Sequence, residues 1–136
     1  MSAKPETTFT KSVHNHLPPE LYRCKTNNPY IGGIPDVWYS GADSDLWVEY
    51  KFEVLPKRDD TIVPITLSQL QTDWLNDRYR EGRNVAVIVG CKEGGVVLTD
   101  LAWNSSLTKK IFLGKIMNRQ QIANWIMERL GGTCGT

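Results

Sequence analysis

The hydrophobic positions along the chain change from a helical period to a strand period and back. Near the start, Phe9, Val13 and Leu17 recur every fourth residue, which predicts a short helix over residues 6–17. Three segments of strand character follow, at residues 21–25, 34–39 and 46–55. The polar turn SGADSD separates the last two, so we expect them to pair as a hairpin.

The second half of the chain alternates helix and strand again. Ser68 precedes an apolar helical pattern and Gln71 follows three residues later, which is the signature of a capping box. Apolar segments at residues 84–90 and 96–101 predict a β-hairpin, and a last helix is expected from about residue 119 to 130.

These elements follow the order α-β-β-β-α-β-β-α, which predicts an α/β fold with a mixed central β-sheet flanked by helices. The length of 136 residues fits a single domain, with flexible ends at residues 1–5 and 131–136. The polar connection at residues 55–64 is expected to be mobile, and residues 102–117 show no clear pattern.

Composition says more about the cellular setting of the protein than about its function. The formal net charge of +1 requires any nucleic-acid partner to be met by a local basic patch. An odd number of cysteines, three, without a CxxC pair argues against a disulfide framework and favours a reducing, cytoplasmic setting. The N-terminal residues lack the apolar segment of a signal peptide, and the longest apolar run is too short to span a membrane.

The predicted hairpin carries charged side chains where a buried sheet would be apolar. Strand alternation places Glu49 and Lys51 on one outward face, whereas Tyr50 points into the core. Hairpin pairing would bring Asp36 beside Glu49, and two carboxylates that close repel each other unless a cation lies between them. Oxygen ligands of this kind suit Mg²⁺ or Mn²⁺, so the pattern indicates a metal-assisted phosphodiesterase centre with Lys51 stabilising negative charge. An exposed sheet face with a surface salt bridge is the alternative.

The same residues resemble a known nuclease motif. Pro35-Asp36, followed on the next strand by Glu49-Tyr50-Lys51, resembles the PD-(D/E)xK pattern. The opening GIPD, the strand LWVEYK and the stretch LSQLQTDWLNDRYREGRNVAVIV resemble the VRR-NUC branch of that superfamily, over roughly residues 6–101. Members of this branch include small phage-type endonucleases and Holliday-junction resolvases. The resemblance implies a restriction-endonuclease-like core and a metal-dependent endodeoxyribonuclease.

The resemblance also implies roles for single residues. Asp36 and Glu49 would be ligands of Mg²⁺ or Mn²⁺, with the backbone carbonyl of Tyr50 as a third ligand, and Lys51 would be the catalytic lysine.

Two further positions match the pattern less sharply. Gln71 falls on a downstream glutamine near the attacking water or the scissile phosphate, and its capping-box role is a second reason for its presence that does not exclude the first. Glu6 falls on an early helical glutamate that would complete the metal ligands, and Glu20 is the alternative for that place.

The implied substrate is DNA, most specifically a four-way junction. A junction takes two symmetric cuts, so a homodimer with two active sites is expected. Lys57 and Arg58, in a loop beside the predicted site, and Arg78 are candidate phosphate contacts, although a solvated helix end explains Arg78 equally well. The alternatives are a nicking, flap-cleaving or restriction-type enzyme of the same core, or a DNA-binding protein that kept the fold without cutting.

Overall fold

A five-stranded mixed sheet forms the centre of the protein, in a computed structural model that describes residues 4–26 and 32–131. The strand order is β1-β2-β3-β5-β6, and only the β3–β5 pair is parallel. The five strands are β1 (Tyr22–Lys25), β2 (Val37–Ser40), β3 (Asp45–Phe52), β5 (Val85–Cys91) and β6 (Gly94–Leu98). Both predicted hairpins, β2–β3 and β5–β6, are confirmed.

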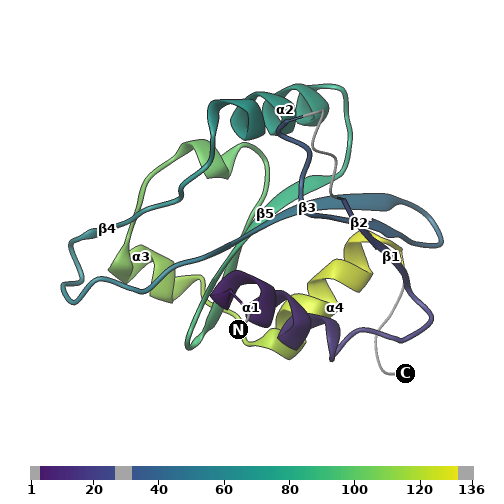
Figure 1. Ribbon diagram of the computed structural model, residues 1–136. Helices are drawn as coiled ribbons and strands as arrows, with labels where there is room; N and C mark the ends of the chain where they lie inside the picture. The colour runs from purple at the N-terminus through teal and green to yellow at the C-terminus, as the bar shows by residue number, and fades with distance from the viewer. Residues whose placement is uncertain (1–3, 27–31, 132–136) are drawn as a thin grey trace.

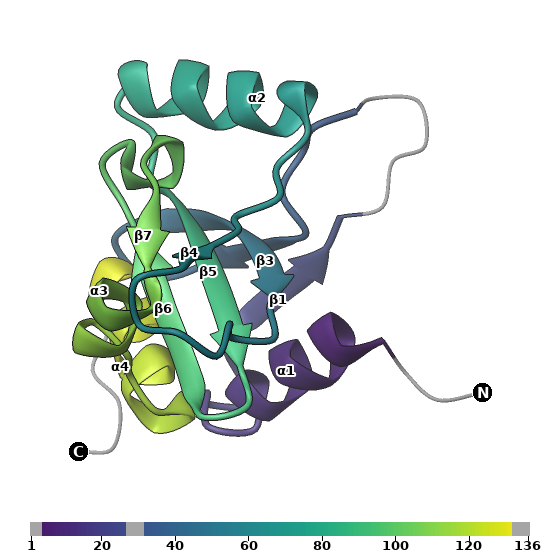
Figure 2. The same cartoon turned by 90° about the vertical axis from the view of Figure 1, so that its left-hand side faces the viewer.

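Helices cover both faces of this sheet. In Figure 1, the first and last helices lie below the sheet and α2 lies above it; Figure 2 shows the same layers from the side. The helices are α1 (Pro5–His14), α2 (Gln69–Arg80), α3 (Lys109–Gly114) and α4 (Arg119–Arg129). The predicted fold class, a mixed sheet flanked by helices, is therefore confirmed. None of the helices in the described part of the chain has the length and apolar character needed to cross a membrane.

Each face of the sheet has its own hydrophobic core. Phe9 and Val13 of α1 and Ile122 and Ile126 of α4 pack on one face, against alternate strand residues such as Tyr50. The other face is covered by α2 and by short elements of the second half, whose apolar side chains meet Val85, Val87 and Val89 of β5. The face of β3 that carries Glu49 was predicted to be exposed, but these elements cover it.

The largest difference between the predicted and the observed organisation lies at residues 55–64. They contain a short strand, β4 (Ile62–Val63), which pairs with β7 (Leu107–Thr108) in a second, two-stranded sheet. The previously unassigned residues 102–117 supply a 3₁₀ turn, η1 (Ala102–Asn104), then β7 and α3. Strands of two residues leave no measurable period in a sequence, which is why neither was predicted.

The ends of the chain also differ from expectation. Pro5 is the first residue of α1 rather than part of a loose start, as suits a proline in the first helical turn. The helix ends at His14, three residues before the predicted end at Leu17. Most of the ends predicted to be flexible, residues 1–3 and 132–136, lie outside the described residues.

Candidate metal centre

Asp36 stands at the entrance to the hairpin, one residue before β2 begins rather than inside that strand. The register of β2 and β3 pairs Val37 with Val48, which places Asp36 next to Glu49. Two hydrogen bonds hold it there: its backbone carbonyl accepts from the N–H of Thr26 at 2.8 Å, and its carboxylate Oδ2 accepts from the N–H of Tyr50 at 3.1 Å.

Glu49 is the one buried charged side chain among the described residues, with only 2% of its surface exposed. The prediction that it faces outward is wrong, because β3 is a central strand and α2 packs over that face. Its Oε2 lies 3.5 Å from the Lys51 Nζ and accepts a hydrogen bond of 3.1 Å from the Gln71 Nε2. Its Oε1 is buried and has no hydrogen-bond partner within the described chain.

The electrostatics of Glu49 follow from this burial. Desolvation, helped by the nearby carboxylate of Asp36, raises the pKa of Glu49 to about 8, although the ammonium of Lys51 acts in the opposite direction. The ammonium of Lys51 therefore does not offset the burial of Glu49 and the negative charge of its acidic neighbours.

Gln71 serves the helix and the site at once. Its N–H donates to the Ser68 Oγ at 3.1 Å, and its Oε1 accepts from the Ser68 N–H at 2.9 Å, so the predicted capping box is present. The same amide group contacts Lys51, whose Nζ lies 3.4 Å from the Gln71 Oε1, and donates to Glu49. Gln71 therefore caps α2 and also contacts Lys51 and Glu49, whereas its role in catalysis stays a prediction.

Gly33 lets the chain approach the start of α2 closely. Its φ is +89°, and a Cβ at this position would lie 2.4 Å from the backbone oxygen of Leu70. Any side chain would be strained in this conformation and would push against the helix turn that carries Gln71.

Glu6, rather than Glu20, is the early acidic residue that reaches this site. Carboxylate oxygens of Glu6, Asp36 and Glu49 all lie within 4.8 Å of one another. Burial and the repulsion of Asp36 raise the pKa of Glu6. Glu20 is exposed in the turn before β1 and is not a member of this cluster.

These residues fit a divalent cation. Three carboxylates converge from α1, from the entrance of β2 and from β3, and the unpartnered Oε1 of Glu49 supplies a free ligand atom. All-oxygen ligand sets with room for water suit Mg²⁺ or Mn²⁺.

A polar network under the site was not predicted from the sequence. The hydroxyls of Tyr39 and Tyr50 lie 2.6 Å apart in the core, and the Nε2 of His14 lies 2.7 Å from the Tyr39 hydroxyl. It links α1 to the two strands of the hairpin. The sequence offered no local signal for it, because the three residues are far apart along the chain.

The predicted DNA contacts lie outside this cluster. Arg78 forms an ion pair of 3.0 Å with Glu81 and stacks over the ring of Trp74. Lys57 and Arg58 are exposed between β3 and β4, where Arg58 lies 3.5 Å from Asp60. Their contact with DNA stays a prediction.

Comparisons with known families and with characterised sequences found no match to this chain. Among solved structures, the fold is similar to that of Hjc from Archaeoglobus fulgidus, a Holliday junction resolvase, with a TM-score of 0.46 and 12% identity. The alignment covers 86% of this chain and 95% of that one. The nuclease function proposed below rests on the site itself, and membership of the VRR-NUC branch stays a prediction.

Proposed function

We propose that this protein is a metal-dependent endodeoxyribonuclease that hydrolyses phosphodiester bonds. The observation that carries this proposal is the convergence of the three carboxylates of Glu6, Asp36 and Glu49 with one ammonium, that of Lys51. Carboxylates that could hold a cation, beside a lysine that can face a phosphate, are what hydrolysis of a phosphodiester requires.

The side chains of the site would have different roles in hydrolysis. A divalent cation bound by the carboxylates would lower the pKa of water and neutralise charge on the phosphate. The ammonium of Lys51, which lies beside Glu49 and Gln71, would stabilise negative charge as it builds on the phosphate oxygens. Gln71 contacts both Lys51 and Glu49 and so fixes the positions of these two side chains. The resemblance implies a 5′-phosphate on the product.

The backbone of Tyr50 supports the predicted third metal ligand. Its N–H donates to Asp36, so this peptide edge of β3 is directed to the side where Asp36 lies. In a strand, the carbonyl of a residue points to the same side as its N–H. The Tyr50 carbonyl is therefore suitably directed to join Asp36 and Glu49 in binding a cation.

We further propose a four-way DNA junction as the substrate and a homodimer as the active assembly. The support is the sequence resemblance together with the symmetry of a junction, which offers two equivalent cuts to two equivalent sites. Sedimentation or gel filtration of the protein with and without a junction would measure the assembly.

A panel of DNA substrates tests the function. Linear, nicked, flapped and four-way DNAs of equal length would be incubated with Mg²⁺, with Mn²⁺ and with a chelator. We expect metal-dependent cutting, fastest on the four-way junction. Preferential cutting of flapped or nicked DNA would assign the alternative nuclease classes. Binding of DNA without cutting of any substrate would leave a non-cleaving DNA-binding protein.

A second capping box, at the start of α4, provides a control that distinguishes the capping role of Gln71 from a role in cleavage. Gln121 occupies the matching position on α4, where its Oε1 accepts from the Asn118 N–H at 2.8 Å and its N–H donates to Asn118. We expect Gln71→Ala and Gln121→Ala each to cost up to about 1 kcal/mol of unfolding free energy. Only Gln71→Ala should slow cleavage, by about tenfold or more, since it alone contacts Lys51 and Glu49. Equal cleavage rates for the two variants, measured beside chemical denaturation, would leave Gln71 with the capping role alone.

A further inference from the structure

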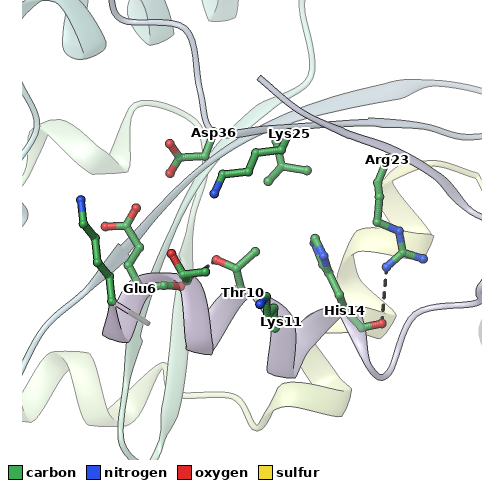
Figure 3. Close-up of a pocket in the computed structure, with 10 residues that line it drawn as sticks. Glu6, Thr10, Lys11, His14, Arg23, Lys25 and Asp36 are labelled. Carbon is green, nitrogen blue, oxygen red and sulfur yellow. Dashed lines mark hydrogen bonds between the residues drawn. The ribbon is translucent and has the colours of Figure 1, made fainter. Parts of the chain in front are cut away.

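A pocket of about 480 Å³ opens directly beside the acidic cluster. Its walls are α1 on one side and β1 with the entrance of β2 on the other, as Figure 3 shows. Glu6 and Asp36 line one end, so the pocket is continuous with the candidate metal centre. A cavity of this size takes a ligand of a few hundred daltons, which is enough for one or two nucleotides of a single strand but far too small for a duplex.

Apart from Glu6 and Asp36, the charged side chains that line this pocket are cationic. Lys4, Lys11, Arg23 and Lys25 all contribute to it, whereas its two acidic residues are both members of the metal cluster. Within the described residues, no carboxylate lies within 4 Å of the ammonium of Lys11 or Lys25, although surface ion pairs are found elsewhere on the molecule. In Figure 3, Lys25 extends from β1 toward the space between Asp36 and Thr10. This charge is available to a ligand.

Arg23 adds a fixed positive charge to the wall. Its guanidinium donates to backbone carbonyls, at 2.7 Å to Pro18 and at 3.4 Å to His14, and these neutral acceptors leave its charge uncompensated. Burial and this neighbouring charge lower the pKa of His14 to about 4, so His14 contributes no positive charge at neutral pH. The cations of the pocket are therefore Arg23 and the lysines.

We propose that this pocket binds the sugar–phosphate backbone of one DNA strand next to the scissile phosphate, with Lys11 and Lys25 as phosphate contacts. The inference rests on the proposed function, since the metal cluster at the end of the pocket defines where the strand is cut. Lys11 follows Glu6 by five residues on α1, which is about 7.5 Å along the helix axis or roughly two nucleotide steps of a B-form strand. Lysines on facing walls would hold the strand as it leaves the metal centre.

The salt dependence of binding tests this pocket independently of cleavage. A labelled single-stranded oligonucleotide would be titrated with protein at several salt concentrations in a chelator, so that no strand is cut. The double variant Lys11→Gln, Lys25→Gln should bind more weakly than wild type. It should lower the slope of log affinity against log salt by about 1.4, because each phosphate contact on a single strand contributes about 0.7.

Lys110→Gln with Lys115→Gln is the matched control. Both lysines are exposed, one on α3 and one just after it, and their loss changes the net charge equally. Figure 2 shows α3 and α1 on opposite sides of the view. The control should keep the wild-type slope. Equal slopes for the two variants would overturn the proposed strand pocket.

Cleavage by the wild-type protein, measured with Mg²⁺ and Mn²⁺, separates the two proposals. If wild type cuts DNA but the pocket variant keeps the slope of the control, the pocket inference fails alone. If wild type cuts none of the substrates, the proposed nuclease function fails. In that case, a reduced slope confined to the pocket variant would still support strand binding between α1 and β1.

Discussion

Replacing Asp36 by asparagine is expected to lower the cleavage rate by about 1,000-fold while leaving the protein folded and able to bind DNA. The carboxylate lies in the acidic cluster with Glu6 and Glu49, so its loss removes a negative charge that a cation needs. The amide oxygen of asparagine can still accept the hydrogen bond from the Tyr50 N–H, which preserves the entrance of the hairpin. Single-turnover cleavage of a junction with Mg²⁺, beside a binding titration, measures both quantities.

Asp73→Asn supplies the control for this experiment. Asp73 is exposed on α2, accepts a hydrogen bond from Gln69 at 2.8 Å, and undergoes the same change of charge. Its cleavage rate should stay within about twofold of wild type, because surface substitutions of this kind have small effects. If Asp36→Asn also cuts at the wild-type rate, Asp36 is not part of the catalytic centre.

Replacing Glu49 by glutamine is expected to stabilise the metal-free protein at pH 8. The folded chain holds the Glu49 proton up to about pH 8, whereas its unperturbed pKa is 4.5. The contribution of Glu49 to the unfolding free energy is therefore intact below pH 4.5 and is lost as the pH rises toward 8. Since each unit of pKa shift corresponds to about 1.4 kcal/mol, the loss is on the order of a few kcal/mol. Glutamine stays neutral throughout this range, so Glu49→Gln should flatten the pH dependence.

Thermal unfolding in a chelator at pH 5 and pH 8 measures this effect, with Glu128→Gln as the matched control. Glu128 is exposed on α4, so its replacement should change neither the stability at pH 8 nor its pH dependence. Addition of Mg²⁺ should raise the unfolding temperature of wild type, because a ligand that binds only the folded state stabilises it. Glu49→Gln should lose most of this gain. If Glu49→Gln is less stable than wild type at pH 8 in the chelator, burial of the Glu49 carboxylate does not destabilise the folded protein.

The hairpin of β2 and β3 was predictable from the sequence because its signals are local. Alternation along β3 puts Glu49 and Lys51 on one face, and a short turn sets the register that brings Asp36 beside Glu49. The capping box of Ser68 and Gln71 is likewise a spacing of three residues. Each of these features depends on neighbours in the chain or on a single turn, so the pattern of residues alone determines it.

The position of Glu6 and the burial of Glu49 depend on packing between segments that are distant in the chain. Glu6 reaches Asp36 and Glu49 only because α1 packs against β3, which settles the choice that the sequence left between Glu6 and Glu20. Glu49 is buried, against expectation, because α2 covers the face of β3 that alternation alone would leave in solvent.

The pocket between α1 and β1 has the same origin. Lys11 and Lys25 belong to different elements, and neither position carries a periodic signal that distinguishes it from any solvated lysine. The sequence by itself determined the strands of the central sheet, the capping box of α2 and the residue types at the hairpin, since these depend on short-range geometry. The tertiary structure alone decided the third carboxylate, the burial that raises the pKa of Glu49, and the cationic wall beside it, because each arises from contacts between segments distant in the chain.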